Sequence, residues 1–255
     1  MGWELCFSLF ANLQSPCIQM SSFTLPSDYR RIQVVNSFEE LVSTPFAGEV
    51  NALCWQRNLA GNFEEVVELL GLNDGMTTLH DTRLRALPLS AAGRMAVETL
   101  IADQQLLRAR GLSPILDCIH GYPRDELSEV VPTDVYSFHV DSAPIPTDTY
   151  LCSYTEAASE GLRNEESRRR VDSPETRAAL LELFGGEDDE EFQEYLTECC
   201  YDLHYDPLPH ARPFSFGLGN LWRIAIQYPG LPVPPCIHRA PATLPGRPPR
   251  LLLIS

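Results

Sequence analysis

Short strand-like segments, separated by prolines and acidic turns, constrain the fold of this chain more than any other feature. They are PILDCI, DVYSFHV, TDTYLCSY, PFSFGL, NLWRIAIQ, PCIHRA and RLLLIS, all in the second half of the sequence. Runs of β-branched and aromatic residues between turn residues are typical of strands. Twenty-one prolines against fifteen glycines also favour many turns over long helices. Residues 113–255 are therefore predicted to form an antiparallel β-barrel or sandwich.

The first part of the chain carries helix signals instead. Ser37 and Asn62 stand as N-terminal caps before acidic first turns. Ser90 precedes a longer run with apolar residues at helical spacing. Residues 20–112 are therefore predicted to be mainly helical and to pack on the barrel, which makes the fold class α+β.

A helical insert is predicted within the β-rich half, at about residues 173–203. Ser173 caps its first helix, and Gly185 follows the end of that helix. The acidic segment GEDDEEFQEYLTECCYDL is predicted to form a second helix, which would contain Cys199 and Cys200.

The charge of the chain limits its partners. The formal net charge is −16. Nucleic-acid affinity comes mostly from lysine and arginine that displace counterions, so such an acidic chain is not expected to bind DNA or RNA. No apolar segment is long enough to span a membrane, so no membrane association is expected.

The cysteines and the N-terminus favour the cytoplasm. Eight cysteines are scattered without a C-x-x-C pair, which indicates reduced thiols rather than a disulfide framework. The N-terminus has no basic region and makes a poor signal peptide. Residues 1–19 are interpreted as a disordered extension or as lying outside the native protein, since Met20 offers another start.

One histidine and one aspartate on a predicted strand form the main candidate for chemistry. With 35 acidic residues in 255, an acidic residue two places after a histidine is common by chance. His139 and Asp141, however, lie in VYSFHVD, where alternate residues of a strand face the same side. An imidazole and a carboxylate would then point together into the barrel.

A late histidine is the candidate for a third metal ligand. His238 lies in PPCIHRAP, another strand-like segment. Two imidazoles and one carboxylate leave adjacent coordination positions open, which suits Fe(II) sites that use O₂. Arg250 opens the last predicted strand and Arg247 precedes it. Either guanidinium could pair with the far carboxylate of a 2-oxo acid, and Tyr150 could hydrogen-bond to such a co-substrate.

The segments FHVD, YLCSY, IHRAP and RLLLIS resemble the 2-oxoglutarate/Fe(II)-dependent oxygenase superfamily. More narrowly, they are similar to an uncharacterised bacterial domain family with Phe-His-x-Asp and a late His-Arg-x-Pro. The resemblance covers roughly residues 130–255. It implies a double-stranded β-helix (jelly-roll) core, with iron bound by His139, Asp141 and His238. It also implies that Arg250, or Arg247 in its place, binds 2-oxoglutarate.

The expectation is therefore an Fe(II)-dependent dioxygenase that hydroxylates or otherwise oxidises a small-molecule substrate with 2-oxoglutarate as co-substrate. One alternative is a non-catalytic, cupin-like barrel that binds a metal or small ligand, and another is an interaction protein whose acidic insert docks a basic partner. A rival ligand set is His204, Asp206 and His210 in LHYDPLPHARP. No phosphate loop or nucleophile elbow is present, so kinase and hydrolase functions lack support.

Overall fold

Two β-sheets and several helices make up the fold of the computed structural model, which describes residues 24–72, 74–125, 130–242 and 246–255. The chain is α+β, as predicted, and most neighbouring strands are antiparallel. The extension predicted for residues 1–19 lies outside the described residues.

The larger sheet has seven strands in the order β1–β2–β11–β6–β13–β4–β3. Only β1 and β2 run parallel to each other. The strands are β1 (Ile32–Val35), β2 (Ala52–Trp55), β3 (Met76–Thr78), β4 (Ile115–Ile119), β6 (Asp148–Ser153), β11 (Leu221–Ala225) and β13 (Arg250–Ile254). The last four correspond to predicted segments. In contrast, β1, β2 and β3 lie in the part expected to be mainly helical, and they extend the sheet on both sides.

The smaller sheet has six strands in the order β10–β7–β12–β5–β9–β8, all antiparallel. The strands are β5 (Phe138–His139), β7 (Glu160–Leu162), β8 (Ser167–Arg169), β9 (His204–Pro207), β10 (Phe214–Ser215) and β12 (Ile237–Arg239). The segment DVYSFHV forms a strand over two residues only, because a turn precedes Phe138. The strands β7, β8 and β9 were not predicted.

The helices that follow Ser37, Asn62, Ser90 and Ser173 begin where the sequence predicts. The Ser173 side chain, however, makes no capping hydrogen bond, and the helix at Asp81–Arg85 was not predicted. The Ser37, Asn62 and Ser90 side chains each accept a backbone N–H of the first turn. The α-helices are α1 (Phe38–Ser43), α2 (Phe63–Leu70), α3 (Asp81–Arg85), α4 (Ala91–Arg108), α5 (Pro174–Phe184) and α6 (Glu190–Glu198). Short 3₁₀ turns are η1 (Asn164–Glu166), η2 (Arg170–Asp172) and η3 (Tyr201–Leu203). One correction concerns Cys199 and Cys200, which follow α6 rather than lie within it.

The seven-stranded sheet lies between the N-terminal helices and the six-stranded sheet. Along β13, Leu251 and Leu253 pack into a core with residues of α1 to α4, whereas Leu252 points the other way. Leu252 belongs to a second core with Trp222 of β11 and Phe214 of β10. Because this second core joins residues of both sheets, the two sheets pack face to face.

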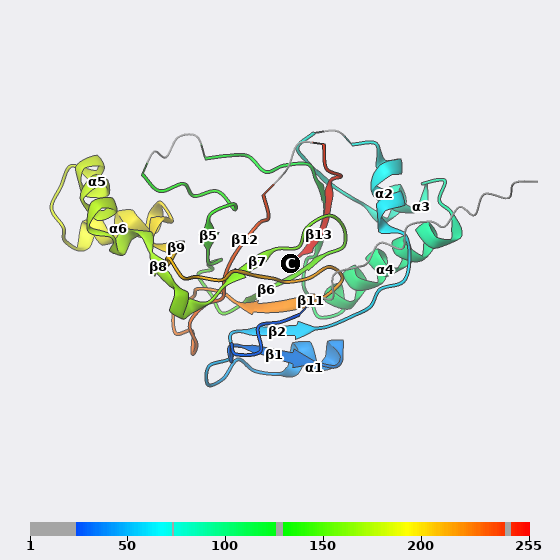
Figure 1. Ribbon diagram of the computed structural model, residues 1–255, viewed down its shortest axis with the longest axis horizontal. Coiled ribbons are helices and arrows are strands. Elements are labelled where there is room, and N and C mark those ends of the chain that lie inside the picture. The colour runs from blue at the N-terminus through cyan, green and yellow to red at the C-terminus, as the bar shows by residue number, and fades with distance from the viewer. Residues whose placement is uncertain (1–23, 73, 126–129, 243–245) are drawn as a thin grey trace, which may run out of the picture.

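Apart from α1, which lies beside β1, the α-helices gather at opposite ends of the molecule. Figure 1 shows α5 and α6 at the left end, and α2, α3 and α4 at the right end. The two insert helices share a small core of their own with Val131 and Val171. The insert therefore extends the fold at the β8–β9 edge of the six-stranded sheet.

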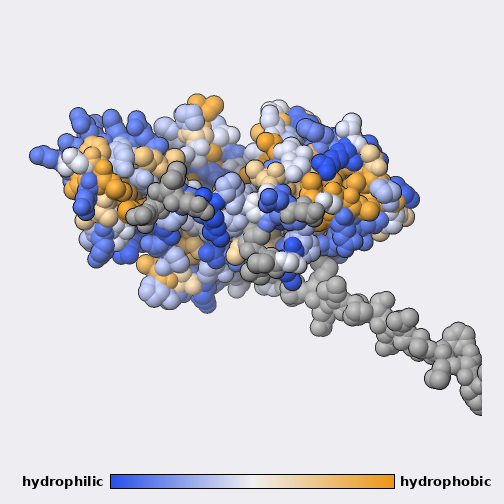
Figure 2. Space-filling view, turned by 90° about the horizontal axis from the view of Figure 1, so that it is seen from above, coloured by the Kyte–Doolittle hydropathy of each residue, from blue (hydrophilic) through white to orange (hydrophobic). Residues whose placement is uncertain are grey.

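The surface carries several separate apolar areas. On the face shown in Figure 2, hydrophilic residues surround these orange areas. Exposed large apolar side chains come from several different elements, among them Val34 of β1, Leu69 of α2 and Met95 of α4. Within the described part of the chain, no helix is long and apolar enough to cross a membrane. The six cysteines there are all free thiols.

Candidate metal centre

A row of residues crosses the six-stranded sheet at the level of His139. Residues directly opposite in antiparallel strands point to the same face. The pairings run through Phe214, Gly161, His238, His139 and His204. Three histidines therefore lie side by side on the face toward the seven-stranded sheet, the side on which Phe214 packs with Trp222 and Leu252.

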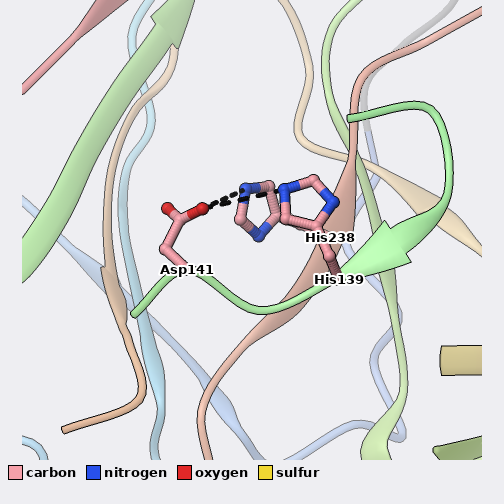
Figure 3. A group of neighbouring side chains, drawn as sticks. All are labelled: His139, Asp141 and His238. Atoms are coloured by element: carbon pink, nitrogen blue, oxygen red, sulfur yellow. Dashed lines mark ion pairs between the residues drawn. The ribbon is translucent and has the colours of Figure 1, made fainter. Parts of the chain in front are cut away.

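The three predicted ligands lie together. One ligand atom from each of His139, Asp141 and His238 lies within 4.8 Å of the others. Asp141 Oδ1 is 3.7 Å from His139 Nε2 and 3.8 Å from His238 Nε2. Figure 3 shows both rings turned toward this carboxylate. Residues 99 positions apart along the chain, His139 and His238, thus meet through the pairing of β5 with β12.

Backbone carbonyl groups orient both imidazoles. His139 Nδ1 is 2.9 Å from the carbonyl oxygen of Ser137. His238 Nδ1 is 3.5 Å from the carbonyl oxygen of Cys236. A carbonyl oxygen only accepts hydrogen bonds, so each Nδ1 carries the proton. In the neutral form of such a ring, Nε2 carries the free lone pair with which histidine binds a metal.

The carboxylate of Asp141 is held from the opposite sheet. The Thr149 hydroxyl on β6 donates to Asp141 Oδ2 over 2.7 Å. The backbone N–H of Gln227 donates to the Asp141 carbonyl oxygen over 2.7 Å. Because Oδ2 is occupied, Oδ1 is the oxygen left for the two histidines. The candidate site is therefore built from both sheets.

Burial and mutual interaction set the protonation of the site. Burial and then the imidazole of His238 lower the pKa of His139 to about 4. Burial alone would raise the pKa of Asp141, but the two imidazoles and the Thr149 hydroxyl outweigh it and lower that pKa. At neutral pH His139 is therefore neutral and Asp141 is ionised, as metal ligands must be.

These donor atoms fit a divalent transition metal. Two imidazole nitrogens and one carboxylate oxygen are accepted by Fe(II), Zn(II) and Mn(II) alike. The other nitrogen of each ring and the other oxygen of the carboxylate already have protein partners. The three remaining donor atoms therefore face one another without competing hydrogen bonds to the described residues.

Arg250 lies on the inner face of the seven-stranded sheet, on the same side of β13 as Leu252. Its side chain is buried, and its guanidinium donates to the hydroxyls of Ser153, Ser159 and Tyr122. No carboxylate pairs with it among the described residues. Burial lowers the pKa of Arg250. A buried cation satisfied only by hydroxyl groups is suited to an anionic ligand.

The other two predicted co-substrate residues are placed differently. Tyr150 is buried in the core shared with the N-terminal helices, so it points away from the metal ligands. Its neighbour Thr149 points toward them. Arg247 is largely exposed and pairs with Glu156 at 2.7 Å. Arg247 lines the same small pocket as Arg250 and Tyr122, but of the two arginines only Arg250 is buried.

The rival ligand set does not come together. His204 is buried in the histidine row, whereas Asp206 pairs with Arg170 at 3.0 Å and His210 is exposed. Among the described residues, only the set at His139, Asp141 and His238 has metal-ligand spacing.

Sequence reasoning missed Ser137, Thr149, Ser153 and Ser159, which support the site, and it named His204 only as a ligand of the rival set. Thr149 could have been found, since it alternates with the apolar Leu151 along β6. His204 could not, because its pairing with His139 is a register between distant strands.

Comparison with known proteins adds no relative. No protein-family model, no curated protein and no solved structure matches this chain.

Proposed function

We propose that this chain is a non-haem Fe(II)-dependent dioxygenase that uses 2-oxoglutarate to oxidise a small-molecule substrate. The observation that carries the proposal is the convergence of His139, Asp141 and His238 on one point. The two imidazoles, through Nε2, and the ionised carboxylate would hold the metal and leave coordination positions open. The cytoplasm is the proposed compartment, supported by the free thiols of the described cysteines.

The proposed core is a double-stranded β-helix. Support comes from the strand order, because the chain alternates between the sheets from β4 to β7 and again from β10 to β13. In such a core, metal ligands of the smaller sheet face the larger sheet across the interior. This is the placement of His139 and His238.

Arg250 is proposed to bind the distal carboxylate of 2-oxoglutarate. Its guanidinium is held by Ser153 and Ser159 through Nε and Nη2, which fixes its plane and leaves Nη1 to donate to a carboxylate oxygen. The Tyr122 hydroxyl, 3.3 Å from Arg250 Nη1, is placed to assist.

The chain's own residues position the reactants and exclude water. Phe216 stacks between Trp222 and His238, with ring centroids 4.3 Å and 6.3 Å away. These rings close one side of the site. Iron, when bound, would supply the activation of O₂ that couples decarboxylation of 2-oxoglutarate to substrate oxidation.

Metal analysis of protein purified without oxygen tests the metal site. We expect the wild-type chain to retain iron, and His139→Ala to lose it. His210→Ala is the matched control, because His210 is exposed, and it should retain iron like the wild type. Equal metal content in wild type and His139→Ala would contradict the proposal.

Co-substrate binding is tested by adding 2-oxoglutarate to the Fe(II) protein under anaerobic conditions. We expect a visible metal-to-ligand charge-transfer band, which Arg250→Ala weakens and Arg247→Ala leaves unchanged. If the wild type shows no band, or if Arg250→Ala decarboxylates 2-oxoglutarate normally, a non-catalytic metal-binding barrel becomes the better description.

A further inference from the structure

A third histidine adjoins the candidate metal centre without belonging to it. His204 opens β9, lies directly opposite His139, and is 4% exposed. The centroids of these two rings are 5.8 Å apart. His204 is not among the residues with metal-ligand spacing. Its buried polar ring therefore needs another explanation.

His204 binds the residue that orients His139. His204 Nδ1 is 2.5 Å from the Ser137 hydroxyl oxygen. The carbonyl oxygen of the same Ser137 accepts from His139 Nδ1. One residue thus connects the two imidazoles, by its side chain on one side and its backbone on the other.

The Ser137 hydroxyl has three hydrogen-bond partners. Besides His204 Nδ1, it lies 3.0 Å from the carbonyl oxygen of Asp134 and 3.3 Å from that of Pro132. The imidazole is the nearest of the three, and it can donate to the hydroxyl or accept from it, depending on its tautomer. These contacts hold Ser137 in the turn before β5, with its carbonyl oxygen toward His139.

We infer that His204 is a positioning residue of the metal centre, which acts through Ser137 on the imidazole of His139. The inference rests on the proposed metal-binding function. Without His204, the Ser137 hydroxyl loses its buried imidazole partner, and the turn that carries the Ser137 carbonyl group is less constrained. The His139 ring then loses its fixed orientation and its preference for a proton on Nδ1.

The first test needs no metal. Long-range ¹H–¹⁵N spectra of ¹⁵N-histidine protein, with a chelator present, report which nitrogen of each ring carries the proton. We expect His139 to be protonated on Nδ1 in the wild type and to show mixed forms in His204→Leu. His204→Asn should restore the wild-type form, because its amide offers both a donor and an acceptor close to the position of Nδ1. His210→Leu, an exposed residue on the same segment, should change nothing.

The second test measures the affinity for Co(II) by calorimetry and by its visible absorption bands. We expect His204→Leu and Ser137→Ala each to weaken Co(II) binding about tenfold. Because both act along one path, the double variant should be no weaker than either single variant.

The outcomes separate the two proposals. Wild-type tautomer and Co(II) affinity in His204→Leu, or additive effects in the double variant, would overturn the role of His204. If the wild type binds no Co(II), the proposed function fails, and the tautomer of His139 alone decides whether His204 positions it. If His204→Leu does not fold, Ser137→Ala carries both measurements.

Discussion

Arg250 and Arg57 show how the same buried side chain can serve different purposes. The side chains of Arg57 and Asp103 are 8% and 4% exposed, and they form an ion pair at 2.6 Å. Arg250 is equally buried but contacts only hydroxyl groups within the described part of the chain. Removing one partner of a buried ion pair destabilises the fold, because the other charge is left without a partner. A buried charge that has no counter-ion, in contrast, lowers the stability of the fold through its own desolvation.

The two arginines are therefore expected to respond in opposite ways to replacement by methionine. Arg57→Met leaves Asp103 buried and unpaired, and should lower the free energy of unfolding by about 3–5 kcal/mol. Arg250→Met removes a buried cation without leaving an anion, and should leave that free energy unchanged or raise it by about 1 kcal/mol. Urea unfolding of metal-free protein measures both. A large destabilisation by Arg250→Met would make Arg250 a structural residue.

The buried histidines make stability depend on pH. Burial is the main cause that lowers the pKa of both His139 and His204 to about 4, against about 6.5 in an unfolded chain. Between these values the unfolded chain binds more protons, so acid favours unfolding. We expect metal-free protein to lose up to about 3 kcal/mol per histidine as the pH falls from about 6.5 to about 4.

Urea unfolding at several pH values, with a chelator present, checks this. The lowered pKa of Asp141 acts in a more acidic window and does not offset the loss. His204→Leu should retain about half of the pH dependence, since only His139 remains. A free energy of unfolding that stays constant over this range would show that the two rings bind protons as readily in the folded chain as in the unfolded chain.

At the scale of elements, the alternation of side chains along a strand decides which of the predicted residues reach the candidate site. The spacing of His139 and Asp141 pointed to one face, and both side chains do reach the same point. Tyr150, a candidate to bind the co-substrate, packs on the other face, because the residues of β6 that face the site are Thr149 and Leu151. The alternation of side chains along β6 separates Tyr150 from Thr149 and Leu151. The sequence does not define which of the two faces points toward the site.

Other parts of the fold cannot be predicted from local sequence patterns. The caps at Ser37, Asn62 and Ser90 are local signals, and they predicted the starts of those three helices correctly. The strand β9 opens with His204 and pairs with β5 across 65 residues. Such a register depends on packing between distant segments. The histidine row, and with it the role inferred for His204, therefore could not be read from the sequence.

A glycine in the same row makes room for the aromatic side chains that pack against His238. Gly161 lies directly opposite His238, and a Cβ there would come 2.3 Å from Phe214 Cζ. Phe214 cannot move easily, since it is buried and stacks on Phe216, which in turn stacks on His238. Only glycine leaves room for this aromatic stack.

Gly161→Ala is therefore expected to lower the free energy of unfolding by about 1–3 kcal/mol and to weaken Co(II) binding through His238. Gly48→Ala is the control. Gly48 has φ +63° and no atom near its Cβ position, so its replacement should cost about 1 kcal/mol of backbone strain. It should leave Co(II) affinity unchanged. Unchanged affinity in Gly161→Ala would show that the aromatic stack does not hold His238.

At the scale of the whole molecule, the candidate site joins the two sheets. His139 and His238 come from the six-stranded sheet, while Thr149 reaches Asp141 from the seven-stranded sheet. Arg250 lies on the inner face of that larger sheet. A metal ion bound by these ligands would therefore add a cross-link through the interior, where the metal-free fold relies on apolar packing.

Metal binding should consequently raise the stability of the entire fold. A ligand that binds only the folded chain stabilises it by about 2.7 kcal/mol at one hundred times its Kd. For a domain of this size, each kcal/mol shifts the Tm by about 2–4 °C. We therefore expect Co(II) at that excess to raise the Tm by about 5–10 °C. Differential scanning calorimetry measures the shift.

The variants show whether the stabilisation passes through the site. His139→Ala removes one ligand and should abolish the shift in Tm, whereas His210→Ala should retain it in full. Thr149→Ala keeps all three ligands but frees Asp141 from the opposite sheet. It should therefore reduce the shift without abolishing it, because the ion then binds more weakly and ties the two sheets together less firmly. An equal shift in wild type and His139→Ala would place the Co(II) elsewhere on the acidic surface.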